Sequence, residues 1–305
     1  MLKKNLIRIR ELEREDILDI LDQAESFSNI LDRDIKKVPT LRGKVIVNLF
    51  YEPSTRTRTS FELAAKILSA DVINISKATS SAVKGESLKD TALTLKALGA
   101  DYIIVRDSHT GVPELISKYG GFKVINAGDG AGEHPTQALL DLFTMRQKTG
   151  RLEGLNVTIV GDIAHSRVAR SNIYALLKVG ANVNLVAPPT LLPAEVEQLG
   201  VKVFHRLEDV YDKTDVLYLL RIQMEREKVS LFPSLKEYAS LYGINGDRLK
   251  KFGPDVIVMH PGPINRGIEI GGDVADGAAS LIEEQVRNGV VVRMAVLYLM
   301  ARKGE

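Results

Sequence analysis

Short runs of β-branched and other apolar residues alternate with stretches of helical periodicity along most of this 305-residue chain. This alternation constrains the fold most, because parallel strands need a crossover connection, usually a helix, to reach their neighbours. The expected strands are residues 44–49, 72–75, 102–105, 123–126, 156–160, 182–186, 201–204, 216–220 and 256–259. The expected helices are residues 54–68, 87–98, 112–118, 135–148, 168–179 and about 279–303. The sequence therefore predicts an α/β protein with mostly parallel, doubly wound sheets flanked by helices.

The length predicts two domains of roughly 150 residues each. The expected helix at 135–148 can carry the chain from one sheet to the next, so we place the first domain at residues 1–135 and the second at 136–284. The last helix is long and mostly apolar, and it needs a large surface to cover. We expect its residues, about 285–305, to return to the first domain.

The composition excludes several classes of protein. Lys and Arg number 41 against 39 Asp and Glu, and this balance argues against a nucleic-acid partner. There is no cysteine, and the five histidines lack metal-site spacing, so we expect no metal. The apolar run Val290–Met300 is too short to cross a bilayer and is broken by Arg293. With no signal peptide in the charged N-terminal residues, we expect a cytoplasmic protein without a membrane partner.

The segment EPSTRTRTSFE, residues 52–62, follows an expected strand and opens an expected helix. A helix N-terminus offers free N–H groups and a partial positive charge, which hydroxyls and a guanidinium can supplement. Those side chains belong to Ser54, Thr55, Arg56 and Thr57. The pattern favours a phosphate site, although it lacks P-loop spacing. The alternative is that Ser54 only caps a helix whose arginines face solvent.

Three further polar clusters follow expected strands, where open α/β sheets bind their ligands. Arg106 follows the strand at 102–105, and His134 lies in the glycine-rich segment 128–137 after the next strand. His260 follows the last strand and lies close to two prolines. We expect His134, in a glycine-rich turn ahead of a helix, to be functional, and His260 to be structural.

The second half of the chain carries two arginines at the ends of neighbouring strands. Arg167 follows the strand at 156–160, and Arg221 and Gln223 follow the strand at 216–220. Two such arginines suit a ligand with two carboxylates, although the pattern equally allows surface arginines paired with nearby acids. The turn before Arg167 lacks the glycines of GxGxxG, which argues against a nicotinamide cofactor.

These segments together resemble the transcarbamoylase family over nearly the whole chain. Residues 54–58, STRTR, are similar to the carbamoyl phosphate signature that aspartate and ornithine enzymes share. Residues 83–87 (VKGES), 221–226 (RIQMER) and 260–267 (HPGPINRG) resemble the aspartate branch. The cysteine and the Asp-x-x-x-Ser-Met-Gly pattern usual in ornithine enzymes are absent. Gly262 stands where some aspartate enzymes have Leu, so only its backbone can serve there.

The resemblance implies transfer of the carbamoyl group of carbamoyl phosphate to the α-amine of L-aspartate. The products are N-carbamoyl-L-aspartate and phosphate, and the reaction is an early step of pyrimidine biosynthesis. The first domain would bind carbamoyl phosphate and the second aspartate. No cofactor is implied.

The same resemblance assigns roles to individual residues. The phosphate would be held by Ser54, Thr55, Arg56 and Thr57. The carbamoyl oxygen would accept hydrogen bonds from Thr57, Arg106 and His134. The carbamoyl amide would be fixed by Gln137 and by the backbone of Pro261 and Gly262. The aspartate carboxylates would be bound by Arg167, Arg221 and Gln223. From the adjacent subunit, the phosphate would be contacted by Ser80 and Lys84, of which Lys84 would also reach aspartate. Those implied to be catalytic are Arg56, Thr57, Lys84, Arg106 and His134.

The resemblance also implies partners within and beyond the site. Active sites that need a neighbour's loop imply a homotrimer, and regulatory chains or other pathway enzymes are possible partners. Glu52 and Arg226 would pair with each other when both substrates bind.

Three alternatives stay open from the sequence. The first is a transcarbamoylase with ornithine or another amino acid as acceptor. The second is a non-catalytic sensor of phosphorylated metabolites or a regulatory subunit, which should lack the full set of arginines, histidine and lysine. The third is a nicotinamide oxidoreductase, which should carry the glycine fingerprint.

Overall fold

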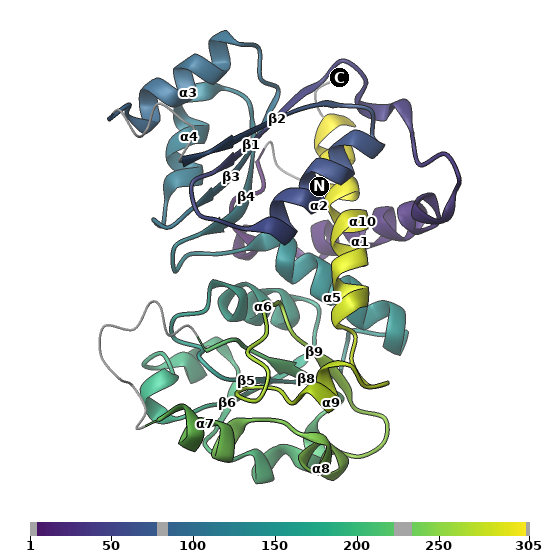
Figure 1. The fold of residues 1–305 in the computed structure, drawn as a ribbon, viewed down its shortest axis with the longest axis vertical. Helices are drawn as coiled ribbons and strands as arrows, with labels where there is room; N and C mark the ends of the chain where they lie inside the picture. Colours follow the sequence, from purple (N-terminus) through teal and green to yellow (C-terminus); the bar gives the residue numbers. More distant parts are fainter. Residues whose placement is uncertain (1–4, 78–84, 223–233, 303–305) are drawn as a thin grey trace. The chain divides into compact units, whose positions relative to one another are not determined.

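The computed structural model describes residues 5–77, 85–222 and 234–302. The chain divides into two compact units (Figure 1). The first consists of Met1–Phe143 with Val286–Glu305, and the second of Thr144–Gln285. The unit boundary falls inside the helix that connects them, a few residues after the sequence-based division at 135.

The first unit contains a four-stranded parallel sheet in the order β2-β1-β3-β4. Its strands are β1 (Val45–Phe50), β2 (Asp71–Ser76), β3 (Tyr102–Asp107) and β4 (Lys123–Asp129). β1, β3 and β4 are buried along nearly their whole length, as expected for parallel strands covered on both faces. β2 is an edge strand and is more exposed.

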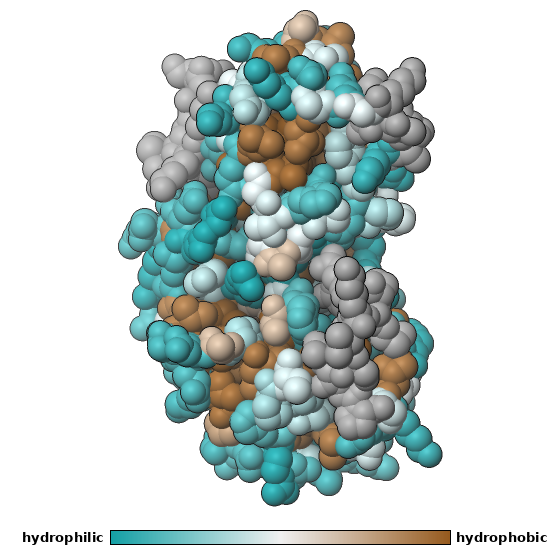
Figure 2. Space-filling model, turned by 90° about the vertical axis from the view of Figure 1, so that its left-hand side faces the viewer, coloured by the Kyte–Doolittle hydropathy of each residue, from teal (hydrophilic) through white to brown (hydrophobic). Residues whose placement is uncertain are grey.

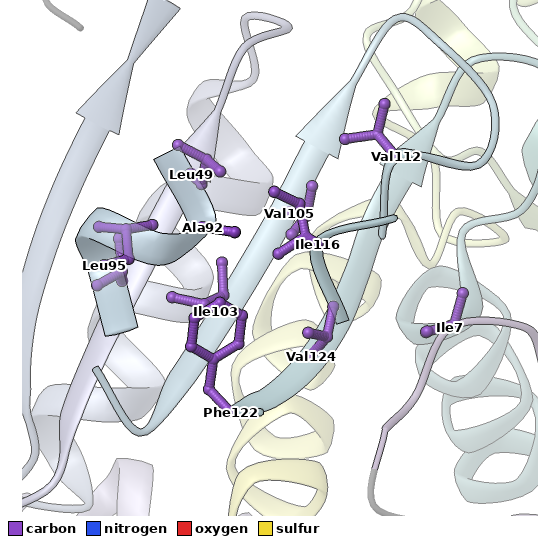
Figure 3. Packing of buried hydrophobic residues seen from close by; sticks show 11 residues of the cluster. Ile7, Leu49, Ala92, Leu95, Ile103, Val105, Val112, Ile116, Phe122 and Val124 are labelled. Carbon is purple, nitrogen blue, oxygen red and sulfur yellow. The ribbon is translucent and has the colours of Figure 1, made fainter. Parts of the chain in front are cut away.

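Helices cover both faces of this sheet. They are α2 (Thr55–Ile67), α3 (Leu88–Ala97), α4 (Val112–Gly120), α5 (Pro135–Thr149) and α10 (Ile282–Ala301). Figure 1 shows α3 and α4 on one face and α2, α5 and α10 on the other. Because alternate strand residues point to opposite faces, Ile103 and Val105 of β3 share the α3–α4 side. There they pack with Leu95 of α3 and Ile116 of α4 (Figure 3).

The second unit contains a five-stranded parallel sheet in the order β7-β6-β5-β8-β9. Its strands are β5 (Asn156–Val160), β6 (Asn182–Val186), β7 (Lys202–Phe204), β8 (Val216–Leu219) and β9 (Ile257–Met259). Its helices are α6 (Arg167–Lys178), α7 (Leu235–Tyr242), α8 (Gly246–Leu249) and α9 (Gly272–Ala275). The predicted fold class, two parallel-sheet α/β domains with a long C-terminal helix that joins the first, is confirmed.

One long helix was not predicted. α1 (Arg14–Ser28) begins with a capping box in which the Glu13 and Asp16 side chains each accept a backbone N–H of the other. Its buried residues recur at helical spacing: Ile17, Ile20, Leu21 and Ala24. Both signals are present in the sequence and identify a helix.

No helix among the described residues is both long enough and apolar enough to span a membrane.

Candidate active site

The strand order of the first unit reverses between β1 and β3, and predicted site residues follow both strands. The chain leaves β1 through α2 to reach β2 on one side, while β3 pairs with β1 on the other side. In open α/β sheets, the crevice at such a switch point, beyond the carboxyl ends of the strands, is where ligands bind. Phe50 at the end of β1 is in register with Arg106 of β3. The sheet therefore brings the Ser54 loop and Arg106 together.

The phosphate motif forms the start of α2. Ser54 is the residue before the helix and has extended backbone angles, φ −161° and ψ 102°, but its side chain accepts no capping hydrogen bond. The capping bond on which the alternative interpretation of Ser54 depended is not formed. Ser54 and Thr55 instead line a pocket of about 550 Å³. Arg58 and Lys77 lie in the same pocket wall and make it cationic.

The next two residues of the motif differ in burial. Arg56 is exposed, whereas Thr57 is buried in the first turn of α2. A long cation at the surface and a short hydroxyl held by packing suit different tasks. The guanidinium can follow a phosphate, while the hydroxyl has a fixed direction.

Arg106 is oriented by two partners within the first unit. One terminal nitrogen of its guanidinium donates to Glu52 Oε1 at 2.7 Å and the other donates to the carbonyl oxygen of Ala127 at 3.1 Å. The pair is largely buried, with side chains 13% and 16% exposed, so solvent screens it less than a surface ion pair. Glu52 was predicted to pair with Arg226, which lies outside the described residues; in this structure it holds Arg106.

His134 follows β4 in a turn that buried polar groups hold from several sides. Asp129 Oδ1 accepts the backbone N–H of Glu133 at 2.9 Å and the side-chain amide of Asn126 at 2.8 Å. Gly130 has φ +43°, and a Cβ there would lie 2.8 Å from the carbonyl oxygen of Ser108, so only glycine fits. His134 is buried, and its carbonyl oxygen accepts the first N–H bonds of α5.

Glu133 ties this turn to the N-terminal segment. Its carboxylate accepts the backbone N–H of Ile9 at 2.7 Å and lies 3.5 Å from the guanidinium of Arg10. Burial raises the pKa of the Glu133 carboxyl, although Ile9 and Arg10 favour its charged form. Glu133 has no local sequence signal, because its partners lie more than a hundred residues away.

The side-chain amide nitrogen of Gln137 is hydrogen-bonded within α5. Nε2 donates to Asp141 Oδ1 at 3.0 Å, one turn along α5, and both side chains are buried. The side-chain oxygen takes no part in this bond and can accept a hydrogen bond. That orientation suits a ligand with an N–H donor, such as an amide.

The second unit has its own switch point, between β5 and β8. Arg167 is the first residue of α6 after β5, and Ser166 caps that helix by accepting the N–H of Ala169 at 3.1 Å. Arg167 is only 6% exposed, so it is not the surface arginine of the alternative interpretation. Arg221 follows β8 and is half-buried. The sheet therefore places both arginines at adjacent strand ends, where a ligand of this unit is expected.

His260 follows β9, and both of its ring nitrogens face protein groups. Nδ1 accepts the N–H of Gly262 at 2.8 Å, so the proton is on Nε2, which lies 3.3 Å from Glu269 Oε1. The His260 N–H donates to the side chain of Gln285 at 2.9 Å. This is the structural role expected for His260. Its bond to Gly262, at φ +60°, engages the backbone N–H of that residue.

Four predicted residues, Ser80, Lys84, Gln223 and Arg226, lie outside the described residues. Among the described part of the chain, no group of three or more His, Asp or Glu side chains is placed to hold a metal ion.

Three buried polar residues of the first unit were not predicted as site residues: Ser60, Asp141 and Arg293. Arg293 had a signal, since it is a single charge inside an apolar run. Ser60 and Asp141 had none, because a polar residue on a helix is ordinarily a solvent-facing one.

Fold and site together define a class: two doubly wound domains, with a Ser/Thr/Arg motif at a helix N-terminus in one and two arginines at adjacent strand ends in the other. Residues 4–147 match the model of the aspartate/ornithine carbamoyltransferase carbamoyl-P binding domain, and residues 153–300 match that of the Asp/Orn binding domain. The chain belongs to the aspartate/ornithine carbamoyltransferase family.

Curated relatives match over nearly the full length. The aspartate carbamoyltransferase catalytic subunit of Heliobacterium modesticaldum is 58% identical over 297 residues, which cover 97% of this chain and 95% of the relative. The subunit of the same name from Moorella thermoacetica is 57% identical over 298 residues, which cover 98% and 97%.

Solved structures agree with these relatives. The catalytic subunit of M. jannaschii aspartate transcarbamoylase has a TM-score of 0.88 and 38% identity and covers 99% of this chain and 100% of its own. Aspartate transcarbamoylase from Trypanosoma cruzi, solved with carbamoyl phosphate and aspartate, has a TM-score of 0.88 and 32% identity, with 97% of each chain covered.

Proposed function

We propose that this chain is an aspartate carbamoyltransferase, which transfers the carbamoyl group of carbamoyl phosphate to L-aspartate in pyrimidine biosynthesis. The observation that carries the proposal is the motif Ser54–Thr57 at the start of α2, beside Arg106 at the switch point of the first sheet. The relatives at 57–58% identity, all named aspartate carbamoyltransferase, support aspartate rather than ornithine as the acceptor.

The chemistry is an acyl transfer. The lone pair of the aspartate α-amine attacks the carbamoyl carbon, a C–N bond forms, and the C–O bond to phosphate breaks. Negative charge builds on the carbamoyl oxygen, which Thr57, Arg106 and His134 stabilise as hydrogen-bond donors. One such donor typically contributes about 3–4 kcal/mol to transition-state stabilisation. The amine proton leaves with the phosphate, so no protein base is required.

The carbamoyl amide needs acceptors, because its NH₂ group has two donors and no lone pair to share. The side-chain oxygen of Gln137 is one, since its nitrogen is engaged by Asp141. The carbonyl oxygens of Pro261 and Gly262 are the others in our proposal, because the Gly262 N–H is already bonded to His260. Acceptors here select an amide over an ester or a methyl ketone.

The phosphate is held by Ser54, Thr55, Arg56 and Thr57. The two carboxylates of aspartate are bound by Arg167, Arg221 and Gln223, with Lys84 of an adjacent subunit. Ornithine would place a side-chain ammonium among these cations, and like charges at that distance repel each other. The paired arginines therefore discriminate between the two acceptors.

Turnover by the purified chain tests this proposal. We expect carbamoyl aspartate to form from carbamoyl phosphate and L-aspartate, and no citrulline to form with L-ornithine. Formation of citrulline alone would move the chain to the ornithine branch. Binding of carbamoyl phosphate with no product from either acceptor would support a sensor instead.

We further propose a homotrimer with shared active sites, in which Ser80 and Lys84 act on the neighbour's substrates. Large apolar side chains are exposed on the edge strand β2 (Ile73), on α3 and directly after it (Leu93 and Leu98) and on α4 (Leu115). Figure 2 shows a hydrophobic patch bordered by hydrophilic residues on the first unit. Such surfaces mark protein contacts, and a second copy is the partner we propose here. Relatives named catalytic subunits also leave room for regulatory chains.

Complementation tests the shared site. Lys84→Ala and Arg56→Ala chains should each be inactive, and a mixture that has exchanged subunits should regain activity in hybrid sites. A mixture with verified exchange and no recovery would mean that each chain builds its own site. The pairing of Glu52 with Arg226 stays a prediction.

A further inference from the structure

Arg293 is a cation buried in the middle of α10. It lies between apolar neighbours in the run Val290–Met300, and only 3% of its surface is exposed. A buried arginine is costly unless other groups compensate its charge and its hydrogen bonds. The groups around Arg293 that compensate its burial therefore indicate its role.

The guanidinium is seated by two residues of α2 and one of its own helix. One terminal nitrogen donates to Ser60 Oγ at 2.7 Å, and the guanidinium carbon lies 4.9 Å from the centre of the Phe61 ring. One turn earlier on α10, Gly289 leaves the space that the group needs, because a Cβ there would lie 2.6 Å from the same nitrogen. The Ser60 hydroxyl, the Phe61 ring and the space left by Gly289 together accommodate a guanidinium.

Two charged residues of the first unit, Asp141 and Arg106, act on Arg293 electrostatically. Burial lowers the pKa of its guanidinium to about 9, the Asp141 carboxylate opposes this change, and Arg106 adds to it. The side chain is therefore cationic at neutral pH. It lies within electrostatic reach of Asp141 on α5 and of Arg106 at the end of β3.

These partners connect Arg293 to the residues that bind carbamoyl phosphate. Ser60 lies one turn beyond Thr57 on α2. Asp141 accepts the amide N–H of Gln137 on α5, the helix that starts directly after His134. Figure 1 shows α2, α5 and α10 on the same side of the sheet. One buried side chain of α10 thus binds α2 one turn beyond Thr57, and its charge acts on the Asp141 carboxylate that holds Gln137.

We propose that Arg293 is a positioning residue for carbamoyl transfer. It holds α2 against α10 through its hydrogen bond to Ser60, so that Thr57, one turn earlier on α2, is placed toward the carbamoyl group. It does not touch the reacting atoms. The inference rests on the proposed function, because it names what the spacing serves.

Three substitutions separate charge, geometry and simple stability. Arg293→Met removes the charge and the hydrogen bond, Arg293→Lys keeps only the charge, and Ser60→Ala removes only the bond. The control is Arg287→Gln, on the same helix, where the side chain is half exposed and pairs with Asp32 at 2.7 Å. The measurements are kcat, both KM values, the melting temperature, and the affinity for inorganic phosphate by titration calorimetry.

If these substitutions displace the site residues, kcat should fall by more than the amount of folded protein does. We expect Arg293→Met to lower kcat about 100-fold, with Arg293→Lys between it and the wild type. Ser60→Ala should lower kcat about fivefold, as expected for one lost hydrogen bond. KM for aspartate should change less than twofold in all three variants, and Arg287→Gln should match the wild type.

The outcomes distinguish this proposal from the proposed function. Folded Arg293→Met or Ser60→Ala with a kcat within twofold of the wild type overturns the positioning role. If Arg293→Met does not fold, Ser60→Ala decides. A wild-type chain without turnover overturns the function; weaker phosphate binding in folded Arg293→Met would then still support the positioning of α2, and unchanged binding would overturn it.

Discussion

His134 and His260 each follow a buried parallel strand and each precede a proline, yet the two regions use them differently. His134 stands at the start of the 15-residue helix α5, in a turn held by Asp129 and Glu133. His260 stands in a loop that does not continue into a helix, and its ring is enclosed by Gly262 and Glu269.

The difference shows that the role of a histidine after a strand depends on the element that the chain enters next. A helix N-terminus adds positive potential, which favours anions and developing negative charge beside it. Such a position suits the role proposed for His134, donation to the carbamoyl oxygen. A histidine with both ring nitrogens engaged by its own loop instead determines the conformation of that loop.

The largest expected effect tests whether the first region carries the chemistry. Arg56→Ala removes the exposed guanidinium beside the phosphate site, and we expect kcat to fall about 1,000-fold. Lys66→Ala is the control, since Lys66 lies on the same helix and pairs with Glu62 at the surface. Steady-state kinetics with both variants measures the effect, and equal losses in the two would remove Arg56 from the mechanism.

Replacing each histidine compares the two regions directly. His134→Asn should lower kcat about 100-fold with little loss of stability, because it removes one donor to the carbamoyl oxygen. His260→Asn should lower the melting temperature and change kcat less than tenfold, because it disturbs a loop. Kinetics and thermal unfolding of both variants provide the data. A loss of stability in His134→Asn together with a large loss of kcat in His260→Asn would contradict both assignments.

A third substitution tests the acceptor site of the second unit. Arg167→Gln removes one of the paired cations while keeping a donor, and we expect KM for aspartate to rise about 30-fold. KM for carbamoyl phosphate should change little. Arg170→Gln, one turn further along α6, is the matched control. A rise in KM for carbamoyl phosphate alone would assign Arg167 to the other substrate.

The smallest effect concerns the support of the His134 turn. Burial raises the pKa of Glu133, so the folded protein binds a proton there more tightly than the unfolded chain does. Glu133 therefore stabilises the folded state at pH values below its pKa in the unfolded chain. This stabilisation is lost as the pH rises through its pKa in the folded protein. The wild type should therefore lose stability relative to Glu133→Gln over that range. Denaturant unfolding at a series of pH values measures the difference, and a constant difference would contradict the assignment.

The alternation of strands and helices could be predicted because both depend on local patterns. Every expected strand is present. The largest difference at a strand end is in β4, which ends at Asp129 instead of residue 126. The polar residues at strand ends could be predicted for the same reason, since parallel strands share one ligand-facing edge. α1 was missed although its capping signal is local.

The pairings that hold the site residues in place could not be predicted. Arg293 and Ser60 are 233 residues apart, Ile9 and Glu133 are 124 apart, and Arg106 and Glu52 are 54 apart. Nothing in a local pattern distinguishes Ser60 from a solvent-facing serine on a helix. Its partner is set by how α10 packs against α2.

The secondary structure, the phosphate motif and the arginines of the two units could be predicted without the fold, because hydrophobic periodicity and helix N-termini depend on residues a few positions apart. Tertiary structure alone decided which side chains orient them. Strand order places Arg106 beside Glu52, and the returning C-terminal helix places Arg293 beside Ser60. The physical reason is that burial and charge pairing depend on the neighbours brought together by folding.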